Sequence, residues 1–172
     1  MKQIMIIILL FTTLCLDTFA QKISGLGGEF SLFSIRPNYR DWVSKKTGFE
    51  LFGGIAAEFE DLKPNDFEAG FKFLHALVYK RTDRTYIGII GKYKWLNLTQ
   101  PDSRASLPIP GFFVGKEWYS KRVHRKGIAV ELGYQVASKV YSVPINYDAT
   151  GKKTFTEFPL ILNVRYTFYT KR

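Results

Sequence analysis

The sequence predicts an all-β chain folded as an antiparallel, up-and-down transmembrane β-barrel of about eight strands. Three observations lead to this fold class. Apolar and polar residues alternate with a period of two along most of the chain, between clusters of turn-forming residues. No apolar stretch after residue 20 is long enough for a membrane-spanning helix. The only cysteine is Cys15, so the chain that follows it can form no internal disulfide.

The first 20 residues, "MKQIMIIILLFTTLCLDTFA", have the pattern of a secretory signal peptide. A lysine at the second position precedes an apolar core from Ile4 to Leu14, and the small residues Thr18 and Ala20 precede the expected cut. We therefore expect a cleaved signal at 1–20 and one barrel domain at 21–172, because no repeat or linker divides the remainder. An uncleaved membrane anchor is the alternative for this segment.

Seven segments carry the alternation, and each has about the length that a tilted strand needs to cross a bilayer. In chain order they are 25–35, 48–59, 67–79, 85–95, 110–119, 127–137 and 158–169. A barrel with both termini on one side needs an even number of strands, so an eighth is expected in 36–46 or in 138–147. Helical spacing in 55–62 and 67–78 leaves a helix as an alternative there, although nearby glycines weaken it.

The two faces of these strands differ in chemistry. In the last strand, one face is apolar throughout and is expected to touch lipid: Leu160, Leu162, Val164, Tyr166 and Phe168. The polar faces of all the strands together supply an expected network of charges in the lumen: Glu29, Glu50, Glu58, Lys72, Lys92, Lys94, Glu117, Glu131 and Arg165. A membrane barrel places its apolar faces outward in this way, whereas a soluble lipocalin-like barrel would place them inward.

Three features favour the membrane arrangement. The polar faces combine small residues and acids with single cations, a mixture that suits a narrow, filled lumen. Aromatic residues lie near strand ends, as in the girdles at membrane interfaces: Tyr79, Tyr93, Trp95, Trp118, Tyr119, Tyr134, Tyr166 and Phe168. The absence of disulfides is the third, since soluble secreted barrels of this type commonly carry them.

The signal ending in "FAQ", the short strands and the last strand "PLILNVRYTF" resemble the small outer-membrane β-barrel proteins of Gram-negative bacteria, most closely those of Bacteroidota. The resemblance covers essentially the whole mature chain and rests on pattern. It implies an outer-membrane barrel of about eight strands, inserted by the barrel-assembly machinery. The chain departs from the family at its end, where Phe168 and Tyr169 are followed by Thr170, Lys171 and Arg172.

The formal net charge is +10, and cations cluster in alternate connections between the expected strands. These cations are Arg36, Arg40, Lys45, Lys46, Lys80, Arg81, Arg84, Lys121, Arg122, Arg125 and Lys126, with Lys171 and Arg172 in the tail. Short turns and a chain end are typical of the periplasmic side, so we expect the basic end there. Contacts with anionic lipid headgroups or lipid A phosphates fit such an end. Nucleic-acid binding is not expected, because cations and exposed rings do not share a surface.

No nucleophile, base and orienting group converge in the sequence, so no catalytic residue, cofactor or metal site is expected. His75 falls on an apolar face, and His124 lies in the basic turn "KRVHRK". "ATGKKT" at 149–154 lacks the context of a phosphate-binding loop, and Gly151 is typical of a hairpin turn.

The leading hypothesis is a small, non-enzymatic outer-membrane barrel with a polar, plugged lumen, which acts structurally or through its exposed loops. The alternative is a secreted, soluble lipocalin-like barrel that binds a hydrophobic ligand. An enzyme acting on membrane lipid is a third hypothesis.

Overall fold

The chain forms ten strands and, among the residues described, no helix. The computed structural model describes residues 23–56, 66–97, 104–120, 126–136, 138–146, 149–156 and 158–171. The strands are β1 (Ile23–Ser31), β2 (Ser34–Trp42), β3 (Thr47–Ala56), β4 (Asp66–Tyr79), β5 (Asp83–Asn97), β6 (Arg104–Tyr119), β7 (Lys126–Gln135), β8 (Ser138–Asn146), β9 (Ala149–Thr156) and β10 (Leu160–Lys171). Within these ranges, no helix has the length and apolar character that crossing a membrane requires. The signal expected at 1–20 lies outside the described residues.

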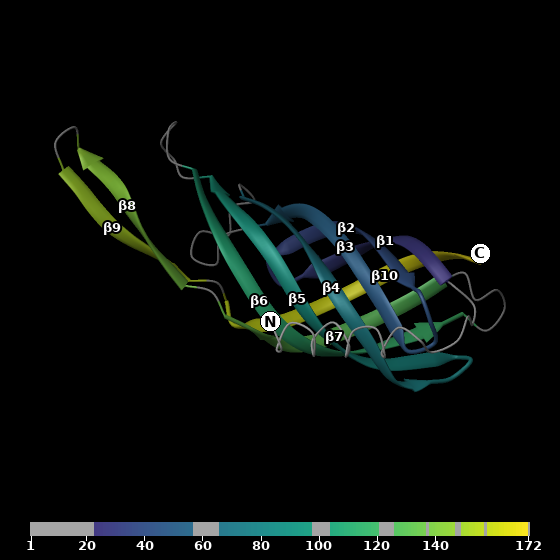
Figure 1. The fold of residues 1–172 in the computed structure, drawn as a ribbon. Helices are drawn as coiled ribbons and strands as arrows, with labels where there is room; N and C mark the ends of the chain where they lie inside the picture. The colour runs from purple at the N-terminus through teal and green to yellow at the C-terminus, as the bar shows by residue number, and fades with distance from the viewer. Residues whose placement is uncertain are drawn as a thin grey trace, which may run out of the picture.

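Eight of the strands close an antiparallel barrel in the order β1-β10-β7-β6-β5-β4-β3-β2 (Figure 1). Neighbours in the barrel follow one another along the chain, apart from the closing pair β1 and β10 and from β7 and β10, which the hairpin of β8 and β9 separates. The seam is made by β1 and β10, with Leu26 opposite Phe168. The predicted fold class, an all-β up-and-down barrel of eight strands, is therefore confirmed.

The eighth strand is β2, the first of the two segments in which it was expected. It pairs with β1 on one side, where Arg36 lies opposite Glu29, and with β3 on the other, where Arg40 lies opposite Glu50. The second candidate segment forms β8, which pairs with β9 in a separate two-stranded sheet. Gly151 lies within β9 opposite Val143, so its predicted role as the turn residue is wrong.

Placing Arg36 and Arg40 in a basic connection was also wrong, because both lie inside a strand and are buried. Arg84, expected in the next basic connection, lies in β5 and is buried as well. Charged residues beside a proline and an asparagine are typical of a turn. Here the barrel interior supplies the carboxylates that neutralise two of these guanidinium groups, Arg36 and Arg40.

The helical alternative for 67–78 is wrong, since β4 is a strand from Asp66 to Tyr79. Its side chains alternate with a period of two: Phe67 and Phe71 are exposed, whereas Glu68 and Lys72 are buried. The alternative helix at 55–62 falls largely on residues outside the described ranges. The segment 25–35, expected as one strand, is divided by a turn at Leu32 and Phe33.

The connections differ between the two ends of the barrel. One end, which we call the turn end, carries the connections at 43–46, 80–82 and 120–125 and the last residues of β10. Exposed cations are present there, among them Lys45, Lys46, Lys80, Arg81 and Lys126. The other end, the loop end, carries the turn at 32–33, the connections 57–65 and 98–103, and the β8–β9 hairpin, which projects beyond the barrel in Figure 1.

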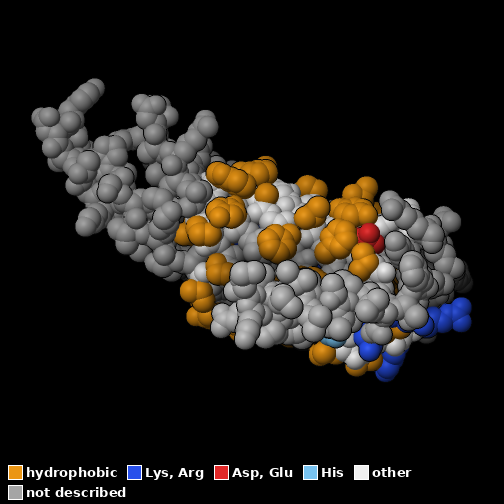
Figure 2. All heavy atoms as spheres, in the orientation of Figure 1, with side chains coloured by type: hydrophobic (Ala, Val, Ile, Leu, Met, Phe, Trp, Pro, Cys, Tyr) orange, Lys and Arg blue, Asp and Glu red, His pale blue; other side chains and the backbone are white. Residues whose placement is uncertain are grey.

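The barrel wall is apolar on the outside. Large exposed side chains occur on all eight strands, and they include Leu26, Ile35, Leu51, Phe71, Ile89, Phe112, Leu132 and Phe168. In Figure 2 hydrophobic side chains cover the barrel wall, and Lys and Arg gather toward the turn end. The ring of Trp118 faces outward, as expected for an aromatic girdle. Tyr119 was expected in the same girdle but points inward, because adjacent residues of a strand point to opposite faces. The Tyr119 hydroxyl donates a hydrogen bond to the buried Glu117.

Candidate functional site in the barrel interior

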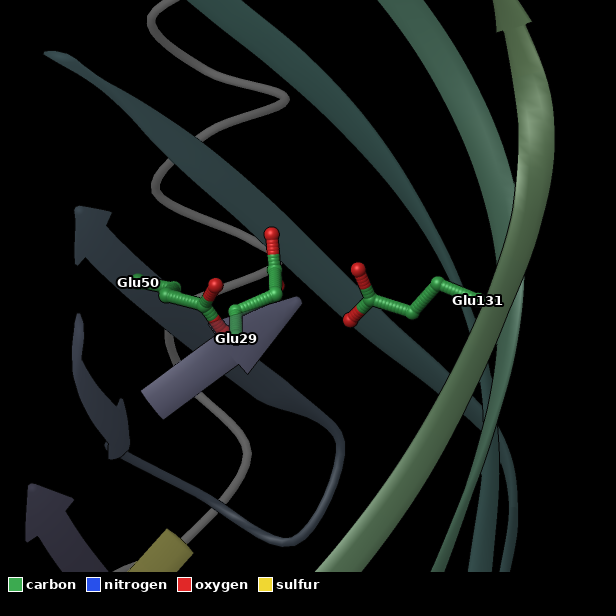
Figure 3. Close-up of side chains that lie close together, drawn as sticks. All are labelled: Glu29, Glu50 and Glu131. Carbon is green, nitrogen blue, oxygen red and sulfur yellow. The ribbon is translucent and has the colours of Figure 1, made fainter. Parts of the chain in front are cut away.

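Three glutamates from distant strands meet at the centre of the barrel. Glu29 is on β1, Glu50 on β3 and Glu131 on β7, and all three occupy inward positions of the alternation. One carboxylate oxygen from each lies within 4.8 Å of the others, and Figure 3 shows the three side chains pointing toward one another. Carboxylates at this spacing repel one another unless a cation lies among them.

Lys72 of β4 supplies that cation. Its Nζ atom donates hydrogen bonds to Glu29 and to Oε2 of Glu131, the latter at 2.7 Å. The same Nζ lies 3.0 Å from Oε1 of Glu50. An oxygen-ligated metal ion would need the same position among these three carboxylates. The geometry therefore assigns the role of the central cation to the ammonium group of Lys72.

Two arginines bridge two of these carboxylates, Glu50 and Glu131. Arg40 donates to Glu50 Oε2 from Nε and to Glu131 Oε1 from Nη2, both at 2.7 Å. Arg165 donates from Nη1 to Glu50 Oε2 at 2.7 Å and to Glu131 Oε1 at 2.8 Å. The hydroxyl of Tyr86 joins them, because it donates to Glu131 at 2.7 Å and accepts from both arginines at 3.1 Å. Each carboxylate is thus shared between cations, an arrangement that fixes side-chain positions.

The network continues toward the loop end through Arg36. This guanidinium contacts Glu29 and also donates to Oε1 of Glu68 at 2.9 Å. Lys92 then donates to the other oxygen of Glu68, at 2.9 Å. Asn163 accepts from Arg36 at 3.1 Å and donates to Glu131 at 3.2 Å, which ties this arm to the centre.

At the turn end the network finishes at Glu117. Its carboxylate accepts hydrogen bonds from the hydroxyls of Tyr119 and Tyr169 and lies 3.5 Å from Nη2 of Arg165. Beyond it, the guanidinium of Arg84 stacks on the ring of Trp42, with 3.7 Å between its Cζ and the ring centroid. Buried rings and aliphatic side chains fill the space beside the charges, including Phe52, Leu74, Ile90 and Phe113.

Seven of the nine charged residues expected in the lumen belong to this one network: Glu29, Glu50, Lys72, Lys92, Glu117, Glu131 and Arg165. The eighth, Lys94, is buried nearer the loop end and forms an ion pair with Asp66 at 3.6 Å. The ninth, Glu58, lies outside the described residues.

Sequence reasoning did not name Arg36, Arg40, Glu68 or Tyr86 as members. Glu68 and Tyr86 could have been identified from the sequence, because the alternation of apolar and polar residues along their strands places both on the inward face. For Arg36 and Arg40 the signal was weaker, because no alternation was evident in that part of the chain. With Arg36, Arg40 and Glu68 included, five carboxylates and five cations face one another in the network, and their formal charges cancel.

The network leaves little room for chemistry. Each of its five carboxylates accepts a hydrogen bond from a cation or a tyrosine hydroxyl. The Oε1 atom of Glu50 accepts none among the described residues, but it lies 3.0 Å from the Lys72 ammonium, so no carboxylate stands apart from a cation or hydroxyl as a free general base would. Some donors are buried without a hydrogen-bond acceptor among the described residues, including Nε of Arg36 and of Arg165. The arrangement is suited to filling and stiffening the barrel.

The five side chains expected to face lipid lie on the outer face of β10. Leu160, Val164 and Phe168 are about half exposed, and Leu162 and Tyr166 are partly covered by neighbouring side chains. The alternate residues Asn163 and Arg165 are buried inside. His75, assigned to an apolar face, lies on the outer wall beside Phe73 and Ile87.

No family model matches the chain, and no curated protein matches it either. Among solved structures, the fold is similar to the N-terminal β-barrel domain of Pseudomonas aeruginosa OprF, with a TM-score of 0.57. The match covers 87% of this chain and 97% of that domain, at 9% sequence identity. At this identity the likeness concerns the fold, and it associates the eight-stranded barrel with the architecture of an outer-membrane protein domain.

Proposed function

We propose that this chain is a small, non-enzymatic outer-membrane β-barrel whose lumen is closed by its own ion-pair network. One observation carries the proposal, namely that the usual distribution of a soluble protein is inverted. Glu29, Arg40 and Lys72 are fully buried inside, while Leu26 and Phe112 on the outer wall are 67% and 63% exposed. Apolar area of this extent on all eight barrel strands would be unfavourable in water and is favourable in hydrocarbon.

The interior also supports the membrane barrel over the soluble alternative. A lipocalin-like protein binds a hydrophobic ligand in an apolar cavity. Here the centre of the barrel contains Glu29, Glu50, Glu131 and their cations in direct contact. Transfer of an uncharged apolar ligand into that space would displace hydrogen-bonded charges without replacing them, which is costly.

A role without catalysis is supported by the way in which the polar groups are used. The carboxylates of the network are all engaged, and the outer wall offers His75 among apolar neighbours rather than beside a nucleophile. The parts left for interaction are at the loop end. There, β8 and β9 pair only with each other, so each keeps one strand edge available for other contacts.

We also propose that the protein resides in the outer membrane and contacts its lipids. A cleaved signal at 1–20 would export the chain, and the barrel-assembly machinery would insert it with the turn end in the periplasm. Lys80 and Arg81, two exposed cations of that end, suit the anionic headgroups of phospholipids. A source among Bacteroidota remains a prediction from the sequence pattern.

Membrane fractionation combined with a heat-shift gel tests the location. We expect the protein in the outer-membrane fraction, migrating faster when unheated than when boiled because the barrel stays folded in detergent. Recovery from the periplasm or the medium as a soluble protein would contradict the proposal. Planar-bilayer recordings test the closed lumen: no steady conductance is expected from the folded wild-type barrel, and stable open channels would contradict a plugged interior.

A further inference from the structure

A groove of about 630 Å³ runs across the outer wall from β4 to β7. Apolar side chains line it: Phe73, Ile87, Ile89, Phe112, Val114 and Leu132. His75 is also part of its lining. The volume is within the range of sites that bind small molecules, about 300–1,000 Å³. In the proposed membrane orientation the groove would open toward lipid, so an acyl chain matches its lining.

The groove has a cationic group toward the turn end. Lys116 lies two residues beyond Val114 on β6, so it is on the same outer face, roughly 6–7 Å further along the strand. Its side chain is 47% exposed, and its Nζ lies 5.6 Å from the centroid of the Trp118 ring. A lysine whose alkyl stem follows an apolar wall and whose ammonium is beside an interfacial ring is typical of a membrane boundary.

Further cations lie at the same end of the barrel. The β4–β5 turn contains Lys80 and Arg81, both exposed, and Asp83, which follows them, lies 4.0 Å from the Lys116 ammonium. The Asp83 side chain is 18% exposed and lies at the limit of ion-pair distance, and the Lys116 side chain is 47% exposed, so the ammonium keeps a solvent-facing side with which to bind a phosphate. The surface therefore combines an apolar groove with a cluster of positive charge at one end.

We propose that this groove and Lys116 form a binding site for one anionic glycerophospholipid. An acyl chain lies along the groove, and the phosphate meets Lys116 with Lys80 and Arg81 beside it. Charge complementarity selects this occupant, because an apolar chain with a negative headgroup matches both parts of the surface at once. The inference rests on the proposed membrane location and adds a particular lipid class at a particular place.

Native mass spectrometry of the folded barrel in detergent tests the site. Wild type is titrated with phosphatidylglycerol or with phosphatidylcholine of the same acyl chains. We expect one phosphatidylglycerol retained per barrel, with at least a fivefold preference over phosphatidylcholine. K116Q should remove most of that preference, and V114W, which fills the groove, should reduce retention of both lipids. K45Q is the matched control, since Lys45 is an exposed lysine in the β2–β3 turn, and it should behave as wild type.

Equal binding of the two lipids, or equal losses in K116Q and K45Q, would overturn the site. Appearance of barrel dimers that phospholipid does not displace would assign the groove to a second copy instead. The heat-shift gel is run on every sample, which separates this inference from the proposed function. A barrel that inserts and shifts normally but shows no lipid preference contradicts only the lipid site, whereas a chain that stays soluble contradicts the membrane proposal.

Discussion

The Nζ atom of Lys72 lies 2.7 Å from Oε2 of Glu131, a residue 59 positions later in the chain. The same ammonium contacts Glu29 and Glu50, so one side chain of β4 neutralises carboxylates from three other strands. Removal of one partner from a buried ion pair leaves charges without compensation, and this costs more than the pair itself contributes. The centre of the barrel should therefore be sensitive to loss of its cation.

Replacement of Lys72 by methionine is expected to destabilise the barrel by about 3–5 kcal/mol, because three facing carboxylates lose their shared cation. The urea midpoint of barrel refolded into lipid vesicles measures the effect, with the heat-shift gel as readout. Lys45→Met is the control, since Lys45 is exposed at the turn end. Equal midpoints for the two variants would show that Lys72 is not needed at the centre.

Arg165 and Glu131 should be coupled energetically, because Nη1 and Oε1 are 2.8 Å apart and both groups are buried. Glu131→Gln and Arg165→Met are each expected to lower the unfolding free energy by a few kcal/mol. The double variant should lose less than the sum, by about 0.5–3 kcal/mol. Strict additivity of the urea midpoints would mean that this contact carries no pairwise energy.

Substitutions at Val164 test whether the outer face of β10 meets lipid, since Val164 and its neighbour Asn163 point to opposite faces. Val164 is 45% exposed on the outer wall and Asn163 is 1% exposed inside. Val164→Arg is expected to cost about 2–4 kcal/mol in vesicles if the site lies near the bilayer midplane, whereas the apolar change Val164→Leu should be neutral.

Site-specific labelling then separates lipid contact from simple packing. Single cysteines in place of Leu162, Asn163 and Val164 carry an environment-sensitive dye, since the only native cysteine is Cys15. Lipid-soluble quenchers should reduce the signal at 162 and 164 and leave that at 163. Uniform quenching at the three positions would argue against an outer face in lipid.

Two adjacent glycines of β1 should respond differently to alanine. A Cβ on Gly27 would lie 2.2 Å from the backbone oxygen of Tyr166 in β10, whereas a Cβ on Gly28 would meet nothing within 4 Å. Gly27→Ala should therefore strain the β1–β10 seam and cost about 1–3 kcal/mol, as overpacking does. Gly28→Ala should be close to neutral. The urea midpoints of the two variants measure the difference. Similar midpoints would contradict the close approach of Gly27 to the backbone of β10.

The β8–β9 hairpin should be dispensable for barrel folding. It pairs with no barrel strand, and the chain on either side is already joined by a hydrogen bond from Gln135 N to Pro159 O of 2.8 Å. Replacement of residues 138–156 by Gly-Gly is expected to leave the heat shift and the urea midpoint unchanged. Loss of folding would show that the hairpin supports the barrel.

Local sequence was sufficient for strands whose alternation is regular. In β7 and β10 the period of two predicted both the strand and its two faces, because side-chain direction depends only on position along the strand. The turn at Leu32 and Phe33 was missed, since "SLFS" contains none of the glycine, proline or asparagine residues that are typical of a hairpin turn.

The sequence by itself determined that the chain forms a barrel with one apolar face and one polar face on each strand. Only the tertiary structure decided which charges meet. Arg165 contacts Glu50 across a separation of 115 residues, and that contact depends on closure of β1 against β10 and on the register of the strands between them. Register is a relationship between strands, set where their side chains pack and their backbones pair, so the pattern of one strand does not contain it. Arg36 and Arg40 became members of the interior for the same reason: their carboxylate partners lie on other strands, which barrel closure brings into contact with them.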